Sequence, residues 1–108
     1  IIQTALRELS EEAGIILQEN QVEKVGILHF FYAANPNRNQ DVHIFSGIYN
    51  GNFKETEEMN PQWRDIESIP YNHMREDDSI WLPKLIKKQT PFDMTFMFNE
   101  EGKLAEYF

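Results

Sequence analysis

The sequence predicts one domain of the α/β (α+β) class, which contains both helices and strands. Three observations predict it: an amphipathic helical pattern over the first 13 residues, two strand-like runs after it, and an alternating run near the C-terminal end. The 108 residues are enough for one domain with a modest core, and 41% of them are hydrophobic. We therefore expect a packed globular domain rather than a disordered chain.

Charge and composition narrow the classes of function. The 18 acidic and 10 basic residues give a net charge of −8, which argues against binding to a nucleic-acid polymer, because such binding needs Lys and Arg beside the phosphates. The chain has no cysteine, which excludes disulfides, thiolate zinc sites and thiol nucleophiles. No apolar run approaches the roughly 20 residues of a membrane span. We expect a cytoplasmic protein that does not enter a membrane.

Residues 1–13 have the pattern of an amphipathic helix. Gly14 stands where a left-handed C-cap would end it. Because the pattern starts at the first residue, with neither a capping residue nor Met before it, we expect upstream sequence to be missing. The apolar side chains fall within an arc of about 100° on a helix of about 3.6 residues per turn; they are Ile2, Ala5, Leu6, Leu9 and Ala13.

Two strands are predicted in the next part of the chain. Residues 22–34 are rich in β-branched and aromatic side chains, and residues 41–49 form a second such run after the polar loop 35–39. We expect these strands to pair antiparallel. The Asn-Gly dipeptide at 50–51 predicts a turn, and residues 62–66 predict a further short strand.

A second helix is predicted around Pro83. Asp78 or Ser79 could cap a helix that continues through residues 80–88. Pro83 lacks a backbone N–H, so we expect the regular helix to begin close to it.

The tail of the chain predicts a β-hairpin. Residues 92–98 and 103–108 alternate between apolar and polar side chains, and Gly102 lies in the segment between them. We therefore expect two paired strands with Gly102 in their turn.

Three glutamates of the first predicted helix form an acidic patch. Glu8, Glu11 and Glu12 are spaced i, i+3 and i+4, so they lie on one face, opposite the apolar stripe. The simpler interpretation is a solvated face with an Arg7–Glu11 pair. The functional interpretation is a site for Mg²⁺ or Mn²⁺, because hard divalent cations prefer clustered carboxylate oxygens.

Residues 7–15, RELSEEAGI, resemble the second half of the Nudix box, G-x5-E-x7-R-E-U-x-E-E-x-G-U, in which U is aliphatic. The resemblance implies an α/β/α sandwich around a mixed sheet, of which residues 1–108 would be a single partial domain, the C-terminal two thirds without the N-terminal strands. It also implies a hydrolase of nucleoside diphosphates linked to another moiety. Its catalytic metal ligands would be Glu8, Glu11 and Glu12, oriented by Arg7 through a salt bridge.

The resemblance extends to the 8-oxo-dGTP diphosphatase branch of that family, the oxidised purine nucleoside triphosphatases. The stretches KVGILHFFY, DVHIF, EMNPQW and DDSIW carry it. It implies that Asp77 and Asp78 read the edge of a purine base, while Trp81, Phe30 and Tyr32 line the base pocket. From the residues alone, a helix cap at Asp78, a solvated Asp77 and ordinary aromatic core packing stay open.

At two positions this chain has a different residue from that branch of the family. Arg75 stands where the branch has a tryptophan over the base, and Gln40 stands where it has a methionine of the pocket, so a more polar pocket is expected. Glu58 matches a loop position at which the family often places a further acidic residue near the metals, as an auxiliary ligand or base. Glu57 is the neighbouring alternative.

These features predict metal-dependent hydrolysis of a nucleoside triphosphate to the monophosphate and pyrophosphate, with oxidised purine nucleotides such as 8-oxo-dGTP as substrates. Two alternatives stay open: a Nudix hydrolase of ADP-ribose or an unmodified nucleoside triphosphate, and a truncated domain that binds nucleotide or a partner without turnover. This chain alone is expected to have little activity and to self-associate through exposed sheet edges. His29, His43 and His73 are too dispersed for a ligand set.

Overall fold

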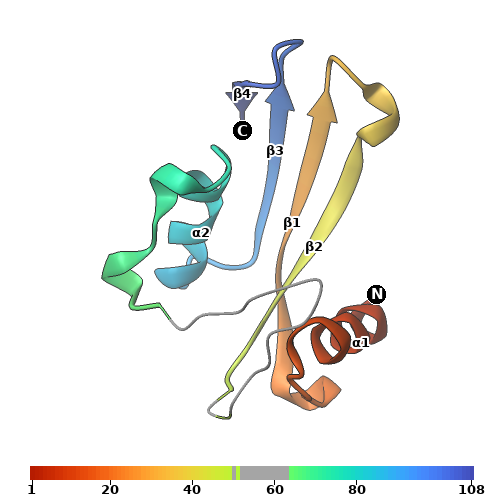
Figure 1. Ribbon diagram of the computed structural model, residues 1–108, viewed down its shortest axis with the longest axis vertical. Helices are drawn as coiled ribbons and strands as arrows, with labels where there is room; N and C mark the ends of the chain where they lie inside the picture. Colours follow the sequence, from red (N-terminus) through yellow and green to blue (C-terminus); the bar gives the residue numbers. More distant parts are fainter. Residues whose placement is uncertain (50, 52–63) are drawn as a thin grey trace.

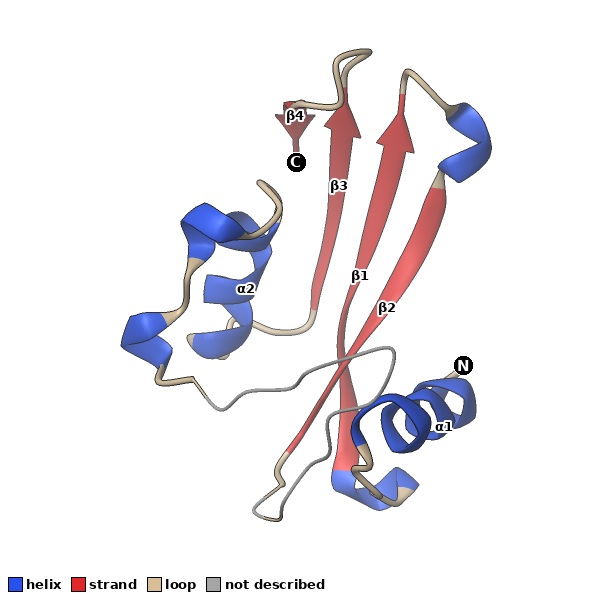
Figure 2. Cartoon of the chain, in the orientation of Figure 1, coloured by secondary structure: helices blue, strands red, loops and turns tan. Residues whose placement is uncertain are grey.

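The computed structural model describes residues 1–49, 51 and 64–108, and these residues hold two α-helices and four β-strands. The strands form one mixed sheet in the order β2-β1-β3-β4, so the predicted α+β class is confirmed. Figure 1 shows α2 beside β3, and α1 in the lower part of the view, where β1 begins. Figure 2 separates the helices from the strands in the same orientation.

β1 (Val22–Tyr32) is an inner strand of this sheet. It pairs antiparallel with β2 (Gln40–Gly47), as predicted, and parallel with β3 (Phe92–Phe98). β3 pairs antiparallel with β4 (Leu104–Tyr107), and Gly102 lies in the turn between them with a φ of 78°. The predicted hairpin is therefore confirmed.

One face of the sheet carries the hydrophobic core. Alternate residues of β1 and β3 point to this face, because side chains of a strand alternate between its two sides. Gly26 of β1 leaves room for the ring of Phe92, since a Cβ at Gly26 would lie 2.2 Å from that ring. The buried cluster consists of Leu28, Phe30, Phe92, Met94, Phe96 and Phe98.

Helix α2 (Asp78–Ile86) packs on this core through Ile80, Trp81 and Leu85. The helix begins at Asp78, so the prediction that its regular part starts close to Pro83 is wrong. Pro83 lies inside the helix and removes only one backbone N–H donor. The first turn still forms, because the N–H groups of Ile80 and Trp81 donate to the carbonyl of the residue before the helix, at 2.9 and 3.1 Å.

Helix α1 (Ile2–Ala13) confirms the first predicted helix. Gly14 ends it in the left-handed conformation, with a φ of 68°, and its N–H donates to the carbonyl of Ser10 at 3.0 Å. Ala13 is the buried residue of the helix, while the rest of the apolar stripe is partly exposed. Neither α1 nor any other described helix is long and apolar enough to cross a membrane.

The short strand predicted at residues 62–66 is wrong for the part that the structure describes. Residues 64–65 have no regular structure, and Ile66–Ser68 form a 3-10 turn closed by the N–H of Ser68 on the carbonyl of Asp65 at 2.9 Å. Ile66 is 65% exposed, so its side chain does not pack in the core. The predicted turn at 50–51 and the start of that strand include residues outside the described part.

The other face of the sheet carries a hydrogen-bonded histidine. His29 of β1 bonds through Nδ1 to Oδ1 of Asp41 on β2 at 2.6 Å, and through Nε2 to Oδ1 of Asp93 on β3 at 2.8 Å. Only the protonated imidazole can donate through both nitrogens. The bond to Asp41 is the largest cause that raises the pKa of His29 above 6.5, and Asp93 adds to it.

Because the folded-state pKa of His29 is raised, its protonation stabilises the fold fully below about pH 6.5 and ceases to do so as the pH rises through the folded-state pKa. We expect the difference in unfolding free energy between the wild type and His29→Gln to shrink as urea unfolding is repeated from pH 5 to pH 9. Asp41→Asn should reduce this pH dependence more than Asp93→Asn. A difference that stays constant across this range would contradict the assignment.

Candidate functional site

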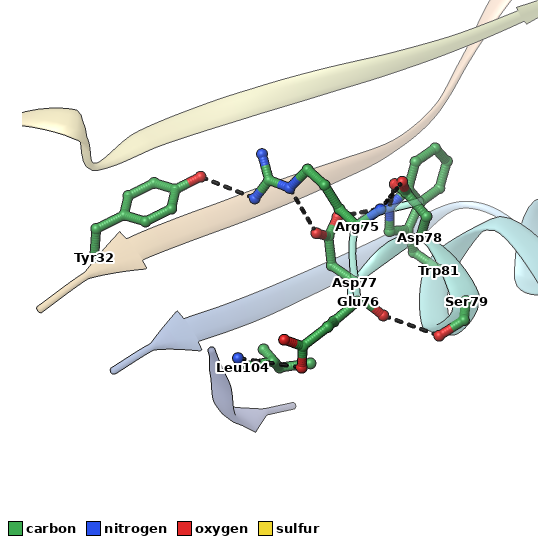
Figure 3. Close-up of polar contacts among 8 residues, drawn as sticks. All are labelled: Tyr32, Arg75, Glu76, Asp77, Asp78, Ser79, Trp81 and Leu104. Carbon is green, nitrogen blue, oxygen red and sulfur yellow. Dashed lines mark hydrogen bonds and ion pairs between the residues drawn. The ribbon is translucent and has the colours of Figure 1, made fainter. Parts of the chain in front are cut away.

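A carboxylate is buried where α2 begins. Asp77, the residue before the helix, is 2% exposed. Its Oδ1 accepts a hydrogen bond from Nε of Arg75 at 3.0 Å, and its Oδ2 accepts one from Nε1 of Trp81 at 3.1 Å (Figure 3). A buried charge is stable only when it is paired and hydrogen-bonded. The interpretation of Asp77 as a solvated residue is therefore wrong.

Asp78 lies beside Asp77 but is less enclosed. Its Oδ2 accepts the backbone N–H of Arg75 at 3.2 Å, and its Oδ1 accepts Nε1 of Trp81 at 3.2 Å, so the indole N–H is shared by the two carboxyls. Burial, followed by the neighbouring charge of Asp77, raises the pKa of Asp78 above its ordinary value. The pair is thus unequal, with Asp78 the carboxyl that gains a proton more readily than an isolated aspartate.

Arg75 is held over the aromatic side chains of the core. Its guanidinium carbon lies 5.0 Å from the ring centre of Phe30 and 5.3 Å from that of Phe98. Its Nη2 donates to the hydroxyl of Tyr32 at 3.0 Å (Figure 3). Burial opposes the charged form, but the bond to Tyr32 and the charge of Asp77 outweigh it and raise the pKa of Arg75. The guanidinium is therefore fixed by several contacts.

Phe30, Tyr32 and Phe98 form an aromatic floor, but Phe30 is not in the lining of the pocket beside it. Phe30 and Tyr32 stack with their ring centres 6.4 Å apart, and Tyr32 stacks on Phe98 at 5.3 Å. A pocket of about 420 Å³ opens beside this floor. Its lining residues are Tyr32, Arg38, Met74, Arg75, Glu76, Phe98 and Gly102.

Gln40 lies away from the lining of that pocket. It is the cross-strand partner of Phe30 and is exposed. Both residues line a separate hollow of about 330 Å³, together with Phe31, Asn39 and Asp41. The structure therefore places Gln40 near the edge of the aromatic floor rather than beside Arg75.

Five residues of the pocket lining were not identified as site residues from the sequence: Arg38, Met74, Glu76, Phe98 and Gly102. Phe98 could have been found, because it continues the alternation that places Phe96 in the core. Glu76 carries no such signal: its Oε2 accepts the backbone N–H of Leu104 at 3.3 Å, and its carbonyl accepts the hydroxyl of Ser79 at 2.9 Å. Glu76 thereby links the segment before α2 to β4.

The three predicted metal ligands lie on α1. Glu8 and Glu11 are exposed and Glu12 is partly buried, and Nε of Arg7 lies 3.9 Å from Oε1 of Glu11. The donor set fits a hard divalent cation, because it consists of carboxylate oxygens on one helical face. Their side chains are not gathered around one point, however: in residues 1–49, 51 and 64–108 no three His, Asp or Glu side chains are placed to hold a metal ion.

The structure gives no position for the auxiliary acidic residue predicted in the loop. Glu58 and its alternative, Glu57, lie outside the described residues. The carboxylate face of α1 and the pocket before α2 are two separate groups of residues within the described part of the chain.

Curated proteins are similar to this chain over nearly its whole length. It is 38% identical over 104 residues to the oxidized purine nucleoside triphosphate hydrolase of Mus musculus, and 39% identical over 108 residues to the protein of the same name from Danio rerio. These alignments cover 95% and 99% of this chain and 64% and 67% of the two relatives, so the chain spans about two thirds of their length. No profile of a known protein family matches the chain.

The unequal environments of the two aspartates predict unequal effects on stability. Asp77→Asn removes the charge that pairs with Arg75, and should lower the unfolding free energy by about 1–3 kcal/mol. Asp78→Asn should lower the unfolding free energy only slightly at pH 7, because the neutral amide also removes the charge repulsion between residue 78 and Asp77. Urea unfolding of both variants at pH 7 measures this difference.

The pH dependence of Asp78→Asn provides the control. A raised folded-state pKa means that ionised Asp78 disfavours the fold above that pKa, and that this cost disappears below the unfolded-state pKa of about 4. The stability of Asp78→Asn relative to the wild type should therefore be greater at pH 7 than at pH 3. Equal losses in the two variants at pH 7 would contradict the assigned environments.

Proposed function

The chain belongs to the Nudix hydrolases, in the family of the oxidised purine nucleoside triphosphate hydrolases, and on this premise we propose that it hydrolyses oxidised purine nucleoside triphosphates such as 8-oxo-dGTP. The products would be the nucleoside monophosphate and pyrophosphate. We further propose that it acts on the nucleotide pool of the cytoplasm. The support for a nucleotide substrate is the combination of this kinship with the pocket before α2.

The observation that carries the proposal is the pair of carboxyls that hydrogen-bond to Arg75, a residue in the lining of an aromatic pocket. A purine edge carries both carbonyl acceptors and N–H donors. An ionised carboxylate can only accept hydrogen bonds, whereas a protonated carboxyl can also donate one. Asp78, with its raised pKa, offers both capacities beside Arg75, which Asp77 holds in place. The rings of Tyr32 and Phe98 offer a flat surface for the base.

The carboxylates of α1 are the groups proposed to bind Mg²⁺, with Mn²⁺ as a possible substitute. Glu8, Glu11 and Glu12 would hold the cation through their oxygens. Bound there, it would supply neutralisation of phosphate charge and a more acidic water for attack on phosphorus. Because these side chains do not converge by themselves, substrate phosphates and solvent would complete the ligand set.

Arg7 and the base pocket would supply the remaining functions of the site. Arg7 lies within reach of Glu11 across one helical turn, and can restrain the orientation of that carboxylate. Asp77, Asp78 and Trp81 would fix the base, which determines where the phosphates lie relative to α1. Positioning of this kind is a large part of catalysis in phosphoryl transfer.

A second candidate function is nucleotide binding without turnover. The dispersed glutamates favour it, since no ligand set is formed in the described part of the chain. A chain of this kind would bind a purine nucleotide in the pocket and leave the phosphates intact.

Hydrolysis is best tested on two proteins, the 108-residue chain and a chimera that adds the N-terminal third of the Danio rerio relative. With Mg²⁺, we expect the chimera to hydrolyse 8-oxo-dGTP to 8-oxo-dGMP and pyrophosphate faster than it hydrolyses dGTP to dGMP and pyrophosphate or ADP-ribose to AMP and ribose 5-phosphate, and the chain alone to be much slower. Addition of EDTA should abolish the reaction. Equal turnover of 8-oxo-dGTP and dGTP would exclude the oxidised-purine preference.

Glu11→Gln in the chimera should lower kcat/KM by about 100-fold or more, because even partners of metal ligands are worth about 10–100-fold. Glu23→Gln is the matched control, since Glu23 is exposed on β1 and outside both groups of site residues. Nucleotide binding by the chimera with no release of pyrophosphate would instead support the non-catalytic alternative.

A further inference from the structure

Arg75 occupies an unusual place for an exposed cation in an acidic chain. Its side chain is 51% exposed, yet the head group is tied to two polar partners and lies over two aromatic rings. These contacts come from β1, β3 and the residues just before α2. A residue fixed from three sides in the lining of a pocket is suited to contact what enters that pocket.

The two hydrogen bonds that hold the Arg75 guanidinium, here called its tethers, leave one of its nitrogens without a role in either bond. Nε bonds to Asp77 and Nη2 bonds to Tyr32, while Figure 3 shows the remaining nitrogen pointing away from both partners. A guanidinium is planar and carries five N–H donors and no acceptor. The pocket therefore presents a donor-only group at a fixed position.

Purine bases differ in how they meet such a group. At position 6, guanine-type bases carry a carbonyl oxygen, which accepts hydrogen bonds, and adenine-type bases carry an amino group, which donates them. A guanidinium can bond to the carbonyl but cannot accept from the amino group. Arginine bound to the carbonyl side of guanine is accordingly the most common specific contact of arginine with a base.

We propose that Arg75 is a specificity-determining residue of this pocket, whose tethered guanidinium selects purine nucleotides with a carbonyl at position 6 over those with an amino group there. The inference rests on the proposed function, because it takes the pocket before α2 as the base site. It goes beyond that function by naming the substrate class and the residue that sets it.

The neighbouring carboxyls fit the same class of base. Asp77 has both oxygens engaged by Arg75 and Trp81, so it acts as an anchor for the cation. Asp78 also accepts a bond at each oxygen, from the backbone N–H of Arg75 and from Nε1 of Trp81, but it is less enclosed than Asp77 and each oxygen has a further lone pair for the adjacent N–H of the base edge. In its protonated form it can also donate to the carbonyl. Arg75 and Asp78 together would thus read the C6 carbonyl and its neighbouring N–H.

The test compares the affinities of two matched product nucleotides, 8-oxo-dGMP and 8-oxo-dAMP, for the chimera defined above. Both carry the carbonyl at position 8, and they differ on the edge that includes position 6. We expect the wild type to prefer 8-oxo-dGMP in isothermal titration calorimetry. Arg75→Leu should weaken the binding of 8-oxo-dGMP by about tenfold, in line with the loss of one hydrogen bond to a charged group, and change the binding of 8-oxo-dAMP by less than about twofold.

Three further variants separate the role in specificity from a role in folding. Arg75→Lys keeps the charge without the planar fork, and should bind both nucleotides with a reduced preference. Tyr32→Phe removes one tether and should give an intermediate preference. Lys87→Gln removes one positive charge, as Arg75→Leu does, but at an exposed position after α2, and should leave the preference unchanged. Thermal unfolding of each variant verifies that it is folded.

Three results would overturn the proposal. If Arg75→Leu bound both nucleotides more weakly by the same factor, Arg75 would only support the pocket. If it bound both more tightly by the same factor, the head group of Arg75 would only occupy space in the pocket. If the wild-type chimera bound neither monophosphate, both this proposal and the base site would fail. If it bound them with an Arg75-dependent preference but released no pyrophosphate from 8-oxo-dGTP, only the proposed hydrolysis would fail.

Discussion

The carboxylate of Asp77 is almost fully enclosed, and the arrangement before α2 depends on how its charge is satisfied. Its two oxygens take donors from opposite directions, Nε of Arg75 and Nε1 of Trp81. The first of these bonds holds the guanidinium over the aromatic rings, and the second fixes the indole against the core. One buried charge thereby joins the loop, the helix and the sheet at the point where a pocket opens.

The same aromatic side chains serve the core and the pocket. Phe30 packs against Phe96, which is fully buried, and also lies beneath the guanidinium of Arg75. Phe98 packs in the cluster and lines the pocket. The packing that stabilises the sheet therefore also determines the shape of the floor, so a change in the core at these positions would alter both stability and binding.

Periodicity explains which parts of the fold could be predicted from the sequence. The helix ending at Gly14, the antiparallel β1–β2 pair and the hairpin around Gly102 follow local patterns, and the structure has all three. The predicted start of α2 was wrong, because backbone hydrogen bonds to the residue before the helix form its first turn although Pro83 lacks an N–H donor. The described part of the strand predicted at 62–66 was wrong, because residues 64–66 offer one apolar side chain, Ile66, and it is exposed. The contacts of Arg75 depend on residues from three elements, which no local pattern contains.

Arg75 and Asp77 form one hydrogen-bonded ion pair in which the carboxylate is buried, and a double-mutant cycle measures their coupling. Urea unfolding at pH 7 of the wild type, Arg75→Ala, Asp77→Asn and the double variant gives their interaction energy. The account predicts a coupling of about 1 kcal/mol or more, as for residues in direct contact within one hydrogen-bonded network. Effects that add to within about 0.5 kcal/mol would contradict it.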